Sequence, residues 1–218
     1  MSGFDLLVAI AVGYLLGGFP TAAVVARVRG KRIFEVGSGN MGAMNTARNL
    51  GFGLGVAVLV VDVAKGSAAV LLGFAMASAL GAPAGASLAL GSSAGVAAIV
   101  GHAWSPYVGF RGGKALATGF GVTLPLFPWG GLAGLTLLVA LVLILRRVTL
   151  ATILTLLAFP LLAYLATMRA TLDQDVAFTA TTVALVSAVV IILKHLLLWR
   201  AARRTPADTD VDADADAG

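Results

Sequence analysis

The chain has 218 residues, of which 59% are hydrophobic and only 11% are charged, and its mean hydropathy is +0.98. These values exclude a soluble globular domain, in which about 25% of residues are charged. They also exclude a disordered chain, which combines low hydrophobicity with high charge. Because a membrane span needs about 20 apolar residues, the composition predicts an all-α polytopic membrane protein. The absence of cysteine excludes disulfides and thiolate metal sites.

The net charge of +5 is unevenly distributed along the chain. Five of the ten acidic residues alternate with small residues in the segment that begins at Asp208. We therefore expect residues 205–218 to form an acidic disordered tail and residues 1–204 to form a single transmembrane domain. The Lys and Arg residues cluster between apolar runs. This pattern is typical of cytoplasmic loops, and we expect no nucleic-acid partner.

Apolar runs predict membrane spans at residues 4–26, 52–80, 82–103, 114–127, 129–145, 149–167 and 176–199. The fourth span is short and is separated from the fifth by prolines and glycines, so it is either a short span or a half-span covered by protein. With seven spans and the N-terminus outside, nearly all basic loop residues fall on the cytoplasmic side. The same count places the C-terminus inside.

Residues 37–48 form a polar cluster rich in small residues. Glycines let the backbone approach a ligand closely, and Ser, Asn and Arg side chains supply hydrogen-bond donors suited to a phosphate. The alternative interpretation is an ordinary solvated turn before a helix. The candidate site residues of this cluster are Gly37, Ser38, Gly39, Asn40, Asn45 and Arg48.

Residues 101–118 form a second cluster, in which Arg111 and Lys114 flank two glycines directly before an apolar helix. Backbone N–H groups at a helix N-terminus, together with two cations, make an anion site. A nucleotide-binding P-loop is excluded, because Ala115 follows the lysine and no strand precedes the loop. His102 is either a base or a cap at the end of the third span. The other candidates in this cluster are Ser105, Gly112, Gly113 and Thr118.

Two further sets of charged residues lie within or beside spans. Asp62 and Lys65 share one helical face, so they form either a structural ion pair or part of a site. His195 is one of two histidines, and the unperturbed pKa of a histidine side chain suits acid–base catalysis. The two histidines are far apart in sequence and acids are few, so we expect no metal site. His195 and Lys194 belong to a basic cluster with Arg200, Arg203 and Arg204, and for these arginines the favoured interpretation is a membrane-edge collar that binds lipid headgroups.

Four motifs follow one another along the chain: Gly18-Phe-Pro-Thr21; Gly37-Ser-Gly-Asn with Gly-Ala-x-Asn and Arg48; Asp62-x-x-Lys-Gly66; and Gly101-His-x-x-Ser-Pro with Phe-Arg-Gly-Gly-Lys-x-x-Ala-Thr118. In order and spacing they resemble the PlsY family of bacterial acyl-phosphate:glycerol-3-phosphate acyltransferases. The matching motifs lie within residues 18–118. After residue 118, the resemblance consists of the pattern of spans and of His195. It implies seven transmembrane helices with the N-terminus outside.

By this resemblance, the protein transfers an acyl chain from acyl-phosphate to the 1-hydroxyl of glycerol-3-phosphate, giving lysophosphatidic acid and phosphate. The family's proposed mechanism uses charge neutralisation and alignment, with a substrate phosphate as proton acceptor. The resemblance implies no cofactor and a monomer in the bacterial plasma membrane, with its active site on the cytoplasmic side. It implies catalytic roles for Ser38, Arg48, Lys114 and His195. It implies substrate-binding roles for Gly37, Gly39, Asn40, Asn45, Asp62, Lys65, His102, Ser105, Arg111, Gly112, Gly113 and Thr118.

The chain departs from the family pattern at several positions. Met44 stands where the family usually has Thr, and Ala115 and Leu116 replace Gly-Val after the lysine. Leu198 and Ala201 stand where the family has Asn and Arg, and the family's later glutamate is missing. Two other functions therefore stay open. One is a membrane transporter or binding protein for a phosphorylated metabolite, and the other is an inactive acyltransferase paralogue.

Overall fold

The computed structural model describes residues 2–203, with side chains described through Arg200. The expected disordered tail, and the interpretation of the Arg203 and Arg204 side chains, lie outside that part. Every regular element within it is helical. The α-helices are α1 (Gly3–Gly18), α2 (Thr21–Val28), α3 (Ala43–Leu50), α4 (Phe52–Ala79), α5 (Ala84–Ala103), α6 (Leu116–Leu126), α7 (Pro128–Leu145), α8 (Val148–Thr171) and α9 (Gln174–Arg203), and the 3₁₀ turns are η1 (Ile33–Glu35) and η2 (Pro106–Val108).

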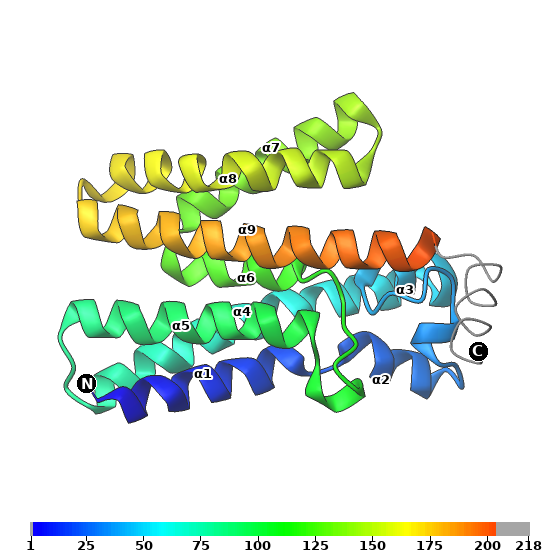
Figure 1. Ribbon diagram of the computed structural model, residues 1–218, viewed down its shortest axis with the longest axis horizontal. Coiled ribbons are helices and arrows are strands. Elements are labelled where there is room, and N and C mark those ends of the chain that lie inside the picture. The colour runs from blue at the N-terminus through cyan, green and yellow to red at the C-terminus, as the bar shows by residue number, and fades with distance from the viewer. Residues whose placement is uncertain (1, 204–218) are drawn as a thin grey trace, which may run out of the picture.

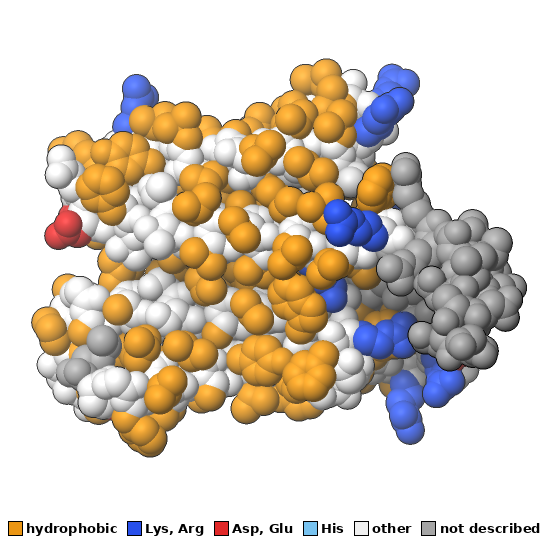
Figure 2. Space-filling model, viewed as in Figure 1, with side chains coloured by type: hydrophobic (Ala, Val, Ile, Leu, Met, Phe, Trp, Pro, Cys, Tyr) orange, Lys and Arg blue, Asp and Glu red, His pale blue; other side chains and the backbone are white. Residues whose placement is uncertain are grey.

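The long helices lie side by side in one bundle (Figure 1). In it, α5 packs against α1 and α4, α6 packs against α4, and α8 packs against α7 and α9. α1 begins at one end of the bundle and α9 finishes at the other, as an odd number of membrane crossings requires. In Figure 2, Lys and Arg side chains gather mainly at the end where α9 finishes, and apolar side chains cover much of the remaining surface. This distribution is the one expected when that end faces the cytoplasm.

Among residues 2–203, six helical segments are long and apolar enough to cross a membrane, with α1 and α2 counted together as Gly3–Val28. The 11 residues of α6 extend for about 16 Å, roughly half of the hydrocarbon core. Protein covers this helix: Ser67 of α4 donates a hydrogen bond to the carbonyl of Gly121 at 2.7 Å. The expectation of a short helix in the fourth position is therefore confirmed. The count of seven crossings and the orientation of the termini stay predictions.

The first predicted span, residues 4–26, is not one continuous helix. It breaks at Phe19 and Pro20, between α1 and α2. The cause is local, because proline lacks an N–H group and disfavours helical geometry in the residue before it. Two carbonyl oxygens at the break gain side-chain donors from elsewhere in the bundle. Ser105 Oγ donates to Gly18 O at 2.6 Å, and Lys65 Nζ donates to Phe19 O at 3.0 Å.

Small residues let α1 approach α5 closely. A Cβ atom added to Gly13 or Gly17 would collide with the backbone of Ala94 or Ala98, respectively. Such close backbone contact between membrane helices is the usual use of a small-x-x-x-small step. The packing fixes α1 against α5, and so places the α1–α2 break beside the end of α5.

Candidate active site

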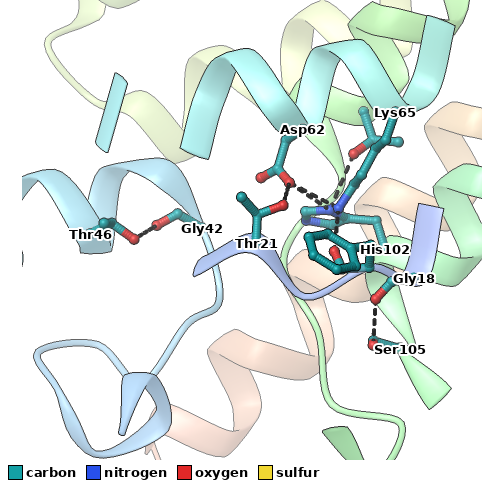
Figure 3. A network of polar contacts seen from close by, with 10 residues as sticks. Gly18, Thr21, Gly42, Thr46, Asp62, Lys65, His102 and Ser105 are labelled. Atoms are coloured by element: carbon teal, nitrogen blue, oxygen red, sulfur yellow. Dashed lines mark hydrogen bonds and ion pairs between the residues drawn. The ribbon is translucent and has the colours of Figure 1, made fainter. Parts of the chain in front are cut away.

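A buried polar network surrounds the α1–α2 break (Figure 3). Lys65 Nζ lies 2.8 Å from Asp62 Oδ1, and Thr21 Oγ1 donates to the same carboxylate oxygen at 3.2 Å. Both members of the ion pair are buried. Asp62 and Lys65 therefore tie α4 to the break, which fits the structural interpretation of this pair.

His102 extends this network toward α6. Its Nδ1 atom lies 3.1 Å from Thr118 Oγ1 and 3.7 Å from Asp62 Oδ1, and the residue is only 3% exposed. The ring faces into the bundle and bonds a neighbouring helix, so it does not cap α5 with its side chain. Buried in this way, His102 is placed to position the loop before α6.

The loop before α6 passes very close to His102. The Gly113 N–H group donates to the His102 carbonyl at 3.1 Å. A Cβ atom on Gly113 would collide with the His102 ring and with the Met41 carbonyl. The two sequence clusters are thus in backbone contact, because Met41 belongs to the first and Gly113 to the second.

Arg111 and Ser105 hold the other side of this loop. The Arg111 guanidinium lies over the Phe34 ring, 3.9 Å from its centroid, a favourable stacking for this cation. Ser105 and Arg111 pair through an isolated backbone bridge, with Ser105 N donating to Arg111 O at 3.2 Å. The loop is therefore shaped by the segments before α3 and after α5 together.

Lys114 stands immediately before the N-terminus of α6. Ala115 caps this helix in a left-handed conformation, with φ of 58°, and no side chain bonds to the first N–H groups. Those N–H groups and the helix dipole favour an anion. Lys114 is partly buried, and no carboxylate within the described residues pairs with it. Burial lowers the pKa of Lys114, because the charged ammonium loses hydration.

His195 lies on α9, which packs against α6, the helix that Lys114 precedes. Its Nδ1 atom is 2.9 Å from the carbonyl oxygen of Ile191, and the residue is buried. Since a carbonyl only accepts hydrogen bonds, Nδ1 carries the proton and Nε2 keeps a lone pair in the neutral ring. Lys114 and His195, which are far apart in sequence, thus belong to neighbouring elements of the bundle.

The first cluster folds around the side chain of Asn45. Asn45 Oδ1 accepts from Ser38 N–H at 3.1 Å, and its Nδ2 group donates to Val36 O and to Asn40 O, each at 3.0 Å. Both amide hydrogens of Asn45 are therefore used within the protein, and its action on a ligand would be indirect. In contrast, Asn40 Oδ1 is buried and has no hydrogen-bond partner within the described residues.

Ser38 and Arg48 lie at the exposed rim of the cluster. Within the described part of the chain, no ion pair or side-chain hydrogen bond engages Arg48. The structure gives no direct contact between Arg48 and Lys114. The two clusters meet instead through Met41 and Gly113.

Lys194 does not take part in an exposed basic collar, the alternative that the sequence left open for its cluster. It is only 6% exposed, and its Nζ atom lies 5.1 Å from the centroid of the Trp104 ring. One sequence signal pointed inward: Lys194 continues the helical stripe of Ser187 and Ile191, which are also buried. By comparison, Arg200 is exposed, as expected for a collar residue.

An apolar cavity of about 440 Å³ opens between α1, α5 and α9. Tyr14, Val96 and Val100 line one side, and Val183 and Val186 line the other. Tyr14 also donates a hydrogen bond from its hydroxyl to Trp104 O at 2.8 Å. The cavity wall is thereby connected to the residue that contacts Lys194.

The profile of the family described as Glycerol-3-phosphate acyltransferase matches residues 7–200. The chain belongs to this family. The match extends through all the predicted spans and beyond the four motifs, so it includes Lys114, His195 and the apolar cavity.

Curated relatives of this acyltransferase family come from several bacteria. Glycerol-3-phosphate acyltransferase 1 of Deinococcus radiodurans is 44% identical over 134 residues, which are 62% of this chain and 64% of that protein. The glycerol-3-phosphate acyltransferase of Geobacter sulfurreducens is 35% identical over 193 residues, covering 87% of this chain and 89% of the relative. The chain therefore spans just under two thirds of the first relative and most of the second.

The fold also matches crystal structures of PlsY, an integral membrane glycerol 3-phosphate acyltransferase. Its glycerol 3-phosphate form aligns with a TM-score of 0.71 at 28% identity, covering 92% of this chain and 94% of that chain. Its lysophosphatidic acid form aligns with a TM-score of 0.70. The all-helical membrane fold predicted from composition is thus shared with a solved member of the family.

Proposed function

We propose that this protein transfers an acyl chain from acyl-phosphate to the 1-hydroxyl of glycerol-3-phosphate, giving lysophosphatidic acid and phosphate. The observation that carries this proposal is Lys114, a partly buried cation at the N-terminus of α6 that pairs with no carboxylate among the described residues. A helix N-terminus with such a cation suits a phosphate. The apolar cavity between α1, α5 and α9 suits the acyl chain.

The reaction needs no covalent enzyme intermediate. The hydroxyl oxygen of the acceptor attacks the acyl carbon, a new C–O ester bond forms, and the bond from the acyl carbon to the phosphate oxygen breaks. Phosphate leaves with that electron pair and takes the hydroxyl proton. The protein supplies alignment and positive charge, which stabilise the developing negative charge.

We assign the site residues to two groups. Lys114 neutralises phosphate charge, His195 orients the acceptor through its Nε2 atom, and Ser38 and Arg48 bind phosphate at the rim. The backbone of the Arg111–Gly113 loop binds the same anions. Positioning roles belong to the side chains that already bond within the protein, namely Asn45, Asp62, Lys65, His102, Ser105 and Thr118. Gly37, Gly39 and Asn40 shape the first loop.

We further propose that the protein acts as a monomer in the bacterial plasma membrane, with this site facing the cytoplasm. The gathering of Lys and Arg at that end of the bundle supports the orientation (Figure 2). Both phosphate-bearing substrates would then reach the site from the cytoplasm or from the inner leaflet.

Purified protein given acyl-phosphate and glycerol-3-phosphate is expected to release phosphate and to form lysophosphatidic acid. The measurement is phosphate release together with lipid analysis, with glycerol as a control acceptor that lacks the phosphate. Absence of release, while a relative of established activity works in parallel, would reject the proposal. Uptake of glycerol-3-phosphate into proteoliposomes without release would support the transporter alternative, and binding without turnover would support an inactive paralogue.

The rate is expected to fall at a lower alkaline pH than it would if an exposed lysine controlled it. Burial lowers the pKa of Lys114, so the site loses this charge before an exposed lysine would titrate. Lys114→Arg keeps its charge at alkaline pH and should move the alkaline limb of the pH–rate profile to higher pH, even if the maximal rate falls. The check is kcat/KM measured from neutral to alkaline pH for both proteins. Superimposable alkaline limbs would contradict the role of Lys114.

A further inference from the structure

We propose that Lys194 binds the phosphoryl group of the acyl donor at one end of the apolar cavity. This inference rests on the proposed function, and it adds a second cation that acts on the donor in particular. The motifs do not include Lys194. The geometry assigns it this role through its burial, its contacts and its place relative to the cavity.

Lys194 is a buried cation that has no counterion among the described residues. It is 6% exposed, and in the described part of the chain no carboxylate lies within ion-pair distance of it. A Lys ammonium inside a membrane bundle is costly unless it is paired or used. The Lys194 ammonium lies 5.1 Å from the centroid of the Trp104 ring, and this contact compensates the buried charge less than an anion would.

The position of Lys194 along α9 places it beyond one end of the apolar cavity. Val183, which lines the cavity, precedes Lys194 by three helical turns on the same face, so the two positions are about 16 Å apart along the axis. On α5, Val100 lines the cavity and accepts a hydrogen bond from Trp104 N–H at 2.8 Å. Lys194 and Trp104 therefore stand together beyond one end of the apolar wall.

Lys194 also lies near the segments that carry the residues assigned to the reaction. Lys194 contacts Trp104, which follows His102 by two residues, and the His102 carbonyl accepts a hydrogen bond from Gly113 N–H. His195 is the next residue on α9, and α9 packs against α6, the helix that Lys114 precedes. An acyl-phosphate with its chain in the cavity would thus present its headgroup between Lys194 and the loop before α6. A phosphate attached to an apolar chain fits this arrangement better than the polar glycerol-3-phosphate does.

The test is a comparison of kinetic constants for Lys194→Met, which keeps the length of the side chain and removes its charge. With palmitoyl-phosphate as donor, the KM for the donor is expected to rise about tenfold or more, as for loss of one charge-assisted hydrogen bond. The KM for glycerol-3-phosphate is expected to stay within about twofold. Lys194→Arg should restore most of the affinity for the donor. Lys31→Met is the matched control, because Lys31 is exposed, and it should leave both constants unchanged.

The outcomes separate this inference from the proposed function. If the wild-type protein shows no turnover, the proposed function fails first. If the wild type is active and the Met variant has unchanged donor KM, or shows only reduced thermal stability, Lys194 has a structural role and the inference is wrong. A rise in the KM for glycerol-3-phosphate alone would assign Lys194 to the acceptor and would also overturn the inference. Should the Met variant fail to fold, Lys194→Gln gives the same comparison with a polar side chain.

Discussion

Replacing Lys114 with Met is expected to lower kcat by a factor of about one hundred or more. The substitution removes a cation at the N-terminus of α6 that pairs with no described carboxylate, and it leaves an apolar side chain of similar length. In the proposed reaction, which needs no covalent intermediate, stabilisation of the charge on the leaving phosphate supplies most of the catalysis. Loss of Lys114 should therefore lower the rate and leave the folded state intact. The measurement is phosphate release at saturating concentrations of both substrates.

Arg48→Ala is expected to reduce turnover by a comparable factor, with a larger effect on the KM for one of the phosphate-bearing substrates. Arg48 is exposed and engages no described carboxylate, so its removal should leave thermal unfolding unchanged. Arg147→Met serves as the control, because it removes an exposed cation from the turn between α7 and α8. Near-wild-type rates in both the Lys114 and Arg48 variants would show that the phosphate site lies elsewhere.

Composition and charge predicted the class of fold because membrane constraints act on the whole sequence. Long apolar runs must become helices, since the hydrocarbon core of the bilayer offers no hydrogen-bond partner to backbone N–H and C=O groups. The short helix after Lys114 was also predictable, because prolines and glycines interrupt the apolar run that follows it. The break inside the first span was missed. Its signal, Pro20, was visible, but the carbonyl partners that make the break tolerable come from α4 and from the segment after α5.

The contact between the two polar clusters could be predicted only in part. The residue types indicated an anion site in each, but no sequence pattern states that Met41 lies against Gly113. The sequence did not predict the inward position of Lys194, for a different reason. A basic residue near the end of a span is usually an interfacial anchor, and only the packing of α9 against α5 shows that this one faces Trp104. Side-chain direction on a helix end is thus set by tertiary contacts.

Lys65→Met is expected to destabilise the protein strongly, by about 3–5 kcal/mol. The substitution leaves the buried Asp62 carboxylate without its cation and removes the donor to Phe19 O. Of the remaining neighbours, Thr21 donates to Asp62 at 3.2 Å, and the His102 ring nitrogen is 3.7 Å away. A neutral hydroxyl donor cannot replace an ammonium, so the uncompensated charge dominates the loss. The measurement is thermal unfolding of the purified protein in detergent.

The double variant Asp62→Asn with Lys65→Met distinguishes a structural pair from two independent contributions. Removing both charges together eliminates the uncompensated carboxylate, and a buried ion pair replaced as a unit is often nearly neutral. The double variant should therefore be more stable than Lys65→Met alone, although it still lacks the donor to Phe19 O. Equal or lower stability of the double variant would show that each residue acts separately. The pair would then stabilise the α1–α2 break mainly through Lys65 and the Phe19 carbonyl, and Lys65→Arg, which keeps a donor there, should be the better-tolerated single change.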